Sequence, residues 1–273
     1  FTMKLFENLL SYDEYLKENP FHQNLGINLE EYGEIDKKII RETSFGVTSE
    51  WVELHPFSAE LDDLIRLHYL ITSRKVTTIL EIGCGKSTIV FDHALEQNKL
   101  KYCDFVQKNL RRSNPFECHS VDNNEKWIEV TKSTNPSIKN VTFYYCPCHV
   151  TTFNGRICTL YDNFPNICPD LIYLDAPDQF SPIGDVRGVS TNHPDRLPMS
   201  ADILSFEHFL LPGTLIVVDG RTANARFLKT NLQRNWDYHH SEEYDQHFFE
   251  LKETPLGVYN QRQIEFCLGP SWE

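Results

Sequence analysis

Residues 78–88, TILEIGCGKST, constrain the fold of this chain more than any other stretch. The β-branched run at residues 76–82 ends in two closely spaced glycines, and residues 87–101 then show helical spacing of apolar side chains. Glycines permit the tight turn that links a strand to a helix, because they carry no Cβ atom. The stretch therefore predicts the strand, turn and first helix of a βαβ unit.

The alternation of strand and helix patterns continues to the end of the chain. Further strands are expected at residues 116–122, 141–147, 171–176, 213–219, 246–252 and 263–268, and further helices at 3–18, 58–74, 124–133, 199–210 and 221–234. Such alternation is typical of an α/β fold with a doubly wound, mostly parallel sheet. We expect an N-terminal helical extension at residues 1–57 and one α/β domain at 58–273. Ser58 is the expected N-cap of the helix that opens the domain.

Two long segments lack a clear period. Residues 101–115 lie between the first helix and the second strand, and residues 177–198 follow the fourth strand. Long segments without regular structure in a compact domain are usually functional. We expect the 177–198 segment to carry specificity.

Composition excludes several functions. The formal net charge is −13, and a nucleic-acid partner would require a basic surface, so none is expected. No apolar run approaches the ~18–20 residues that span a bilayer. The first residues are acidic instead of resembling a signal peptide. A cytoplasmic protein without a membrane partner is the expectation, and composition leaves the oligomeric state open.

The eight cysteines are expected to be reduced, because no export signal is present. The tightest group is CPCH at residues 146–149, followed by Cys158 and Cys168. A zinc site there is conceivable, but the spacing matches no common Cys-x-x-Cys pairing. Scattered thiols are therefore favoured over a metal site.

Two common nucleotide-binding motifs do not fit the glycine turn. A phosphate-binding P-loop would need a glycine at position 80, which is Leu80. The dinucleotide fingerprint would need a closing glycine where Thr88 stands, and an acidic residue ~20 positions after the loop. Asp122 lies about twice that far along, so a nicotinamide or flavin enzyme is a weak alternative.

A third motif does fit, and it begins with Glu81, Gly83, Gly85 and a helix start at Ser87 and Thr88. It continues in register, since Asp122 ends the second strand, Asp175 ends the fourth, and LLPGTLIVVD at 210–219 enters the fifth. Over residues 58–268 the chain resembles the class I S-adenosylmethionine-dependent methyltransferases. The resemblance implies a Rossmann-like seven-stranded sheet with an antiparallel last strand, and S-adenosylmethionine as the cofactor.

The resemblance also implies roles for residues around the turn. Glu81 would orient the loop and face the methionine ammonium group, the glycines would leave room for the cofactor, and helix amides would point at its carboxylate. Asp122 would accept hydrogen bonds from the ribose hydroxyls, assisted by Asn123. Either Cys148 or His149 would adjoin the adenine. The expected cofactor-binding residues are Glu81, Gly83, Cys84, Gly85, Ser87, Thr88, Asp122, Asn123 and Asp175.

The implied chemistry is methyl transfer to an oxygen of a small-molecule or saccharide acceptor. The expected catalytic residues are Asp175, Asp178 and His193, the last as a general base. Arg187 and Arg196 would bind an anionic substrate. Two alternatives keep the fold: methylation of a protein side chain, and a non-catalytic subunit that binds the cofactor.

A divalent metal held by Asp175 and Asp219 is an alternative that is not favoured, although hard cations prefer carboxylate oxygens. Asp219 would otherwise cap the turn before the next helix. His239, His240 and His247 are expected at a strand edge, without a ligand role.

Overall fold

The computed structural model describes residues 4–29 and 60–272. It contains a seven-stranded sheet in the order β3-β2-β1-β6-β7-β9-β8. All neighbouring strands are parallel except at β9, which is antiparallel to both β7 and β8. The strands are β1 (Thr78–Ile82), β2 (Glu117–Asp122), β3 (Val141–Tyr145), β6 (Leu171–Leu174), β7 (Leu215–Asp219), β8 (Trp236–Ser241) and β9 (Gln246–Leu251).

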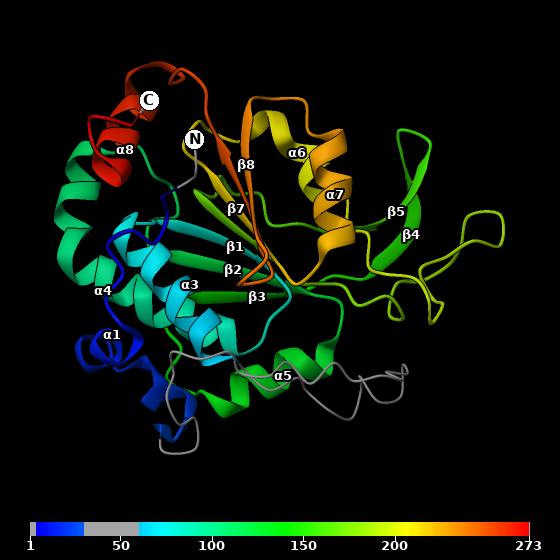
Figure 1. Ribbon diagram of the computed structural model, residues 1–273, viewed down its shortest axis with the longest axis horizontal. Coiled ribbons are helices and arrows are strands. Elements are labelled where there is room, and N and C mark those ends of the chain that lie inside the picture. The colour runs from blue at the N-terminus through cyan, green and yellow to red at the C-terminus, as the bar shows by residue number, and fades with distance from the viewer. Residues whose placement is uncertain (1–3, 30–59, 273) are drawn as a thin grey trace.

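Helices cover both faces of this sheet. In Figure 1, α3 and α4 lie on one face, and α6 and α7 lie on the other. The helices are α1 (Tyr12–Glu18), α3 (Leu61–Ser73), α4 (Lys86–Asn109), α5 (Glu125–Thr134), α6 (Asp202–Phe206), α7 (Thr222–Asn231) and α8 (Gly257–Leu268), with the short 3-10 helices η1 (Phe21–Leu25) and η3 (Glu207–Phe209).

Alternate residues of each parallel strand enter different cores. Ile79 of β1 packs with α3 and α4, whereas its neighbours Leu80 and Ile82 pack on the side of α6 and α7. Strands buried on both faces read as continuous apolar runs, which explains the β-branched pattern at residues 76–82. The predicted α/β fold and the seven-stranded sheet with an antiparallel last strand are confirmed.

The prediction of an irregular segment at residues 101–115 was wrong over most of its length. Helix α4 continues through these residues to Asn109. The extra turns are stabilised by packing on α8: the ring of Phe105 stacks on Phe266 at 4.9 Å, and Tyr102 meets the same ring edge-on. The contact joins segments about 160 residues apart, so local periodicity could not reveal it.

The second C-terminal strand was also misplaced. Residues 263–268 belong to helix α8, and the strand that pairs with β9 is β8, on the other side of a short turn. The short apolar run IEFCL fits a strand or one face of a helix equally well, since periodicity cannot separate the two over five residues.

A two-stranded antiparallel hairpin, β4 (Cys148–Phe153) and β5 (Arg156–Tyr161), was not predicted. Its turn is formed by Asn154 and Gly155, both with positive φ. An Asn-Gly pair between two apolar runs is the strongest short-range signal of a hairpin, so the sequence did carry this information.

The described part of the N-terminal extension packs against the domain. The expected helix at 3–18 is shorter than predicted and begins at Tyr12. Tyr15, Leu16 and Phe21 form one apolar cluster with residues of α3 and with Val90 of α4. The predicted N-cap Ser58 and the 57/58 domain boundary lie outside the described residues. Within the described ranges, no helix is long and apolar enough to cross a membrane.

Candidate functional site

The ends of four parallel strands bring the predicted site residues to one edge of the sheet. Register places Ile82 of β1 beside Val121 of β2 and beside Leu174 of β6, and Leu174 beside Val218 of β7. The next residues on these strands are Gly83, Asp122, Asp175 and Asp219. In open α/β sheets, ligands bind outside the carboxyl ends of the strands.

Glu81 fastens the glycine turn to its surroundings. Its carboxylate is fully buried and accepts hydrogen bonds from the hydroxyls of Ser87 (2.6 Å), Thr88 (2.7 Å) and Ser120 (2.5 Å). Burial raises the pKa of Glu81 to about 7, although the three hydroxyls act in the opposite direction. The loop-orienting role therefore has a structural basis, and contact with a methionine ammonium group stays a prediction.

The two glycines of the turn serve different purposes. Gly83 has a φ of +105°, and a Cβ atom built there would lie 2.7 Å from Cβ of Ala176. Its missing side chain makes room for the end of β6. At Gly85 the backbone is extended, and an added Cβ would meet no atom within 4 Å. Open space for a ligand therefore lies at Gly85 and not at Gly83.

Asp122 connects the ends of β1 and β2. Its Oδ2 accepts a 3.0 Å hydrogen bond from the Cys84 amide, and its Oδ1 accepts a 2.7 Å bond from the Asn124 amide. Burial raises the pKa of Asp122, and these two amides oppose that shift. The neighbouring Asn123 donates from its side chain to Ser181 Oγ at 2.9 Å. The segment after β6 is therefore fastened to the end of β2.

Asp175 reaches solvent from a crowded position at the end of β6. Desolvation by the surrounding atoms and the negative charge of Asp219 raise the pKa of Asp175, against the positive charge of Arg221. A carboxyl group shifted towards neutral pH can exchange a proton more readily than an ordinary aspartate.

Arg221 was not among the predicted site residues. Its guanidinium donates a 2.6 Å hydrogen bond to the Pro177 carbonyl, and its charge interacts with Asp175 and Tyr161. The Nε atom of Arg221 and the hydroxyl of Tyr161 are both buried without a hydrogen-bond partner in the described part of the chain. Nothing in the sequence distinguishes Arg221 from a solvated residue at a helix start.

The predicted site residues of the 177–198 segment either hold the segment's own turns or are exposed. Asp178 Oδ1 accepts hydrogen bonds from the amides of Phe180 (2.6 Å) and Ser181 (2.9 Å). His193 is exposed and accepts from the Asp195 amide, and Arg196 donates to the Ser190 carbonyl. Arg187 is exposed. The segment has no helix and projects with the β4–β5 hairpin in Figure 1.

Asp219 is held within the sheet. Its Oδ2 accepts from the Tyr173 hydroxyl at 2.7 Å, and its Oδ1 accepts from the Gln246 amide at 3.2 Å. The metal-ligating groups found among the described residues include neither Asp175 nor Asp219. Asp219 therefore bonds to Tyr173 and Gln246 of neighbouring strands, whereas it was expected to cap the turn before the next helix.

One potential metal-ligating group contains two of the histidines that were expected at a strand edge. His240 and His247 come within ligand range of Asp245, but their rings stack in parallel at 4.0 Å. Both nitrogens of His247 already contact hydroxyls, those of Thr222 and Tyr238. Stacked rings direct their lone pairs side by side instead of at one ion, so this arrangement does not suit a metal.

The other predicted ligands lie in or near the hairpin. Cys148 is buried in the core of the domain, and His149 is half-exposed with Nε2 3.0 Å from Asp162 Oδ2. All eight cysteines are free thiols. Burial raises the pKa of Cys146, Cys148 and Cys158, which keeps these thiols protonated.

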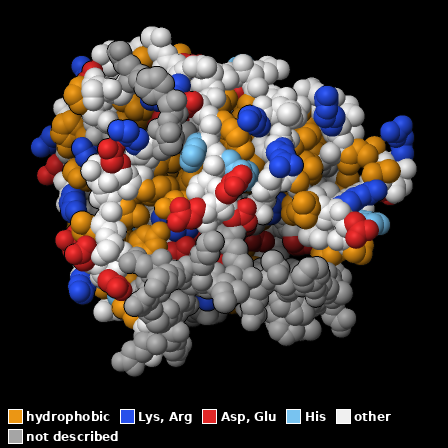
Figure 2. Space-filling view, viewed as in Figure 1, with side chains coloured by type: hydrophobic (Ala, Val, Ile, Leu, Met, Phe, Trp, Pro, Cys, Tyr) orange, Lys and Arg blue, Asp and Glu red, His pale blue; other side chains and the backbone are white. Residues whose placement is uncertain are grey.

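Charged side chains are distributed unevenly on the face seen in Figure 2. Acidic side chains gather near its centre, beside histidines, whereas Lys and Arg side chains gather over α7 and out along the projecting part of the molecule. On a chain with a formal charge of −13, the Lys and Arg side chains on this face are therefore concentrated away from the acidic centre.

Several solved structures of methyltransferases match this chain at low identity. PaMTH1 of Podospora anserina, bound to SAH, is 14% identical with a TM-score of 0.40, and the match covers 77% of this chain and 91% of that one. The O-methyltransferase TomG of Streptomyces achromogenes, in complex with SAM, is 15% identical with a TM-score of 0.36, covering 91% and 94%. The N-methyltransferase NodS of Bradyrhizobium japonicum is 14% identical with a TM-score of 0.35, covering 76% and 94%.

No protein-family model and no curated protein matches the sequence. The fold is assigned from the sheet itself. It has seven strands, with β9 inserted antiparallel between β7 and β8, and the glycine turn follows the central strand β1. By this sheet order and the position of its glycine turn, the chain has the fold of the class I S-adenosylmethionine-dependent methyltransferases.

Proposed function

We propose that this protein transfers a methyl group from S-adenosylmethionine to an oxygen of a small-molecule or saccharide acceptor. The observation that carries the proposal is the meeting of the open face of Gly85, the carboxylate of Asp122 and the Asp175–Arg221 pair at one edge of the sheet. A site for the cofactor and a site for the acceptor would then lie side by side.

The residues at the glycine turn suit the cofactor. The space at Gly85 allows a ligand to approach the backbone, and the start of α4 has no side-chain cap to occupy its free amides. Each Asp122 oxygen accepts one amide hydrogen bond and retains a lone pair for a ribose hydroxyl. When bound, S-adenosylmethionine would supply an electrophilic methyl group.

Asp175 and Arg221 would act on the acceptor. Asp175, with its raised pKa and access to solvent, would take the proton of the acceptor hydroxyl. Arg221 Nε and the Tyr161 hydroxyl lack protein partners in the described ranges, and buried polar atoms normally find one. A polar or anionic acceptor would supply the missing hydrogen-bond partner of each group, and the two groups would in turn orient the acceptor.

The 177–198 segment would confer specificity. It follows Asp175 directly, is fastened to the cofactor side through Asn123 and Ser181, and carries Arg187, His193 and Arg196. In this role the two arginines would bind an anionic group of the acceptor, and His193 would assist proton removal once the acceptor is present. Asp178 would shape the segment through its turn.

Calorimetric titration with S-adenosylmethionine and with its demethylated product tests the cofactor. We expect micromolar binding of both ligands, lost in Gly85→Arg and retained in Gln107→Arg, which adds the same charge at an exposed position of the same helix. Binding justifies an acceptor screen of sugars, phosphorylated metabolites and phenols, with peptides as the competing class. If the folded protein binds neither ligand at millimolar concentration, the proposal fails.

A further inference from the structure

A cavity of about 670 Å³ lies at the opposite edge of the sheet from the candidate site. It is bordered by the start of β1, the loop before β2, the segments before β6 and β7, and one side of α8. Its volume falls within the range of small-molecule pockets, roughly 300–1,000 Å³. The amino ends of the strands border it, so it is separate from the edge where Gly85 and Asp175 lie (Figure 1).

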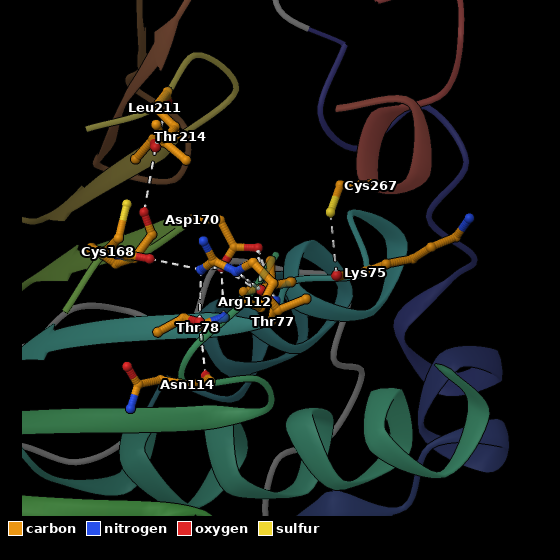
Figure 3. Close-up of polar contacts among 12 residues, drawn as sticks. Lys75, Thr77, Thr78, Arg112, Asn114, Cys168, Asp170, Leu211, Thr214 and Cys267 are labelled. Carbon is orange, nitrogen blue, oxygen red and sulfur yellow. Dashed lines mark hydrogen bonds and ion pairs between the residues drawn. The ribbon is translucent and has the colours of Figure 1, made fainter. Parts of the chain in front are cut away.

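Arg112 holds this edge of the sheet rigid. Figure 3 shows its guanidinium extending to the Thr77 and Thr78 hydroxyls, at 2.9 and 2.7 Å, and to the Cys168 carbonyl at 2.7 Å. Asp170 in turn accepts from the amides of Thr77 and Thr78. Arg112 is only 5% exposed and fully engaged. The cavity therefore has a preformed floor, and this arginine is not available to a ligand.

The adjacent Arg111 is differently placed. It lines the same cavity and is exposed, and its guanidinium lies 5.2 Å from the ring centroid of Tyr259. Across residues 4–29 and 60–272 it forms neither a hydrogen bond nor an ion pair. A cation without a carboxylate partner, on a chain of charge −13, is a candidate for binding an anion.

Gln263 supplies a second and independent polar feature. This α8 residue lines the cavity and is only 8% exposed, yet its carboxamide has no hydrogen-bond partner among the residues that the structure describes. Its amide atoms are not among the fully buried, unpartnered atoms of the described residues, so the carboxamide is reachable from the cavity that it lines. A ligand inside the cavity could therefore donate a hydrogen bond to the Gln263 carboxamide, accept one from it, or do both.

The remaining walls are apolar and aromatic. Phe164 and Phe206 lie together at 5.9 Å, and large apolar side chains surround the opening: Phe209 is 81% exposed, Leu256 58% and Tyr259 52%. Exposed side chains of this size around a concavity commonly mark a binding site. Aromatic walls offer a flat apolar body a large contact area that a free inorganic ion cannot use.

We propose that this cavity binds a small organic anion, an aromatic or alkyl molecule bearing a carboxylate, sulfonate or phosphate group. The anionic group contacts Arg111, the apolar body lies between Phe209 and Tyr259, and Gln263 bonds a polar atom of the ligand. This site does not depend on the methyltransferase assignment, because no residue of the glycine turn contributes to it.

Two fluorescent probes test the proposal: anilinonaphthalene sulfonate, which is aromatic and anionic, and the neutral phenylnaphthylamine. The titrations use the full chain carrying Gly85→Arg, which obstructs the other edge. We expect Arg111→Gln to weaken sulfonate binding about tenfold and leave the neutral probe unchanged, since only the charged contact is lost. Phe209→Ser should weaken both probes.

The matched control is Arg262→Gln, which removes the same charge from an exposed position of α8 outside the cavity. Arg111 and Phe209 are exposed, so their variants should fold, and far-ultraviolet circular dichroism checks this. The proposal is overturned if Arg262→Gln weakens the sulfonate as much as Arg111→Gln. It is also overturned if sedimentation shows that a second copy covers this face and excludes both probes.

Discussion

The backbone amide of Cys84 donates a 3.0 Å hydrogen bond to Oδ2 of Asp122. One carboxylate thus links the glycine turn after β1 to the end of β2, and its other oxygen fixes the start of the next loop through the Asn124 amide. The proposed cofactor site therefore depends on Asp122 twice, for shape and for ligand contact.

Asp122→Ala should weaken binding of S-adenosylmethionine by about 2–3 kcal/mol, the value of a lost pair of charge-assisted hydrogen bonds. Calorimetry measures the change, with Asp104→Ala, an exposed position on α4, as the control. Unchanged affinity in Asp122→Ala would show that the ribose lies elsewhere.

Gly83→Ala should destabilise the fold far more than Gly85→Ala. The first substitution combines a positive φ with a Cβ atom 2.7 Å from Ala176, whereas the second meets open space. We expect Gly83→Ala to lower the free energy of unfolding by about 2–4 kcal/mol, and Gly85→Ala to lower it by less than about 1 kcal/mol. Urea denaturation measures both, and equal losses would refute the close packing of Gly83 on β6.

Asp175→Asn should lower kcat by roughly 10²–10⁴-fold while cofactor affinity stays within about twofold, because the amide cannot accept the acceptor's proton. Steady-state kinetics and calorimetry separate the two effects. Asp185→Asn, an exposed position in the same segment, is the control. A fully active Asp175→Asn variant would remove this residue from the proton transfer.

Glu81 and Asp202 should each lose their contribution to the free energy of unfolding as pH rises from about 4 to 7. Burial raises the pKa of Glu81 and of Asp202 to about 7, from 4.5 and 3.8 in the unfolded chain. In this window the folded state holds protons that the unfolded state has released, so each group contributes on the order of 3 kcal/mol that is lost on deprotonation.

Glu81→Gln should flatten this pH profile, since the amide cannot titrate. Urea denaturation at pH 5 and pH 8 measures the difference for both proteins, and Asp104→Asn should keep the steep profile. If the stability of wild type and of Glu81→Gln changes equally between the two pH values, Glu81 is ionised in the fold throughout.

Chelation should leave the activity intact. Both Asp219 oxygens accept hydrogen bonds within the sheet, from Tyr173 and Gln246, and the potential metal-ligating groups among the described residues include neither Asp175 nor Asp219. Activity assays before and after dialysis against EDTA measure this. Loss of activity that Mg²⁺ restores would establish the metal alternative.

Much of the fold was predictable because its strands are buried on both faces. The runs at β1, β6 and β7 are short and mostly apolar, and the glycine turn marks where the first of them meets α4. The Asn154–Gly155 turn of the hairpin was equally visible. Local residue chemistry determines these features, so a sequence displays them.

Other features depended on residues far apart in the chain. Stacking of Phe105 on Phe266 joins the extended end of α4 to α8, and α8 occupies residues 263–268, where a strand was predicted. The buried Nε of Arg221, which has no hydrogen-bond partner in the described part of the chain, and the position of Gln263 on the cavity wall follow only from the packing of the chain. The sequence alone determined the parallel strands that carry the site and the acidic and glycine residues at their ends. The tertiary structure decided which polar groups are left without partners, because burial is a property of the whole packed chain.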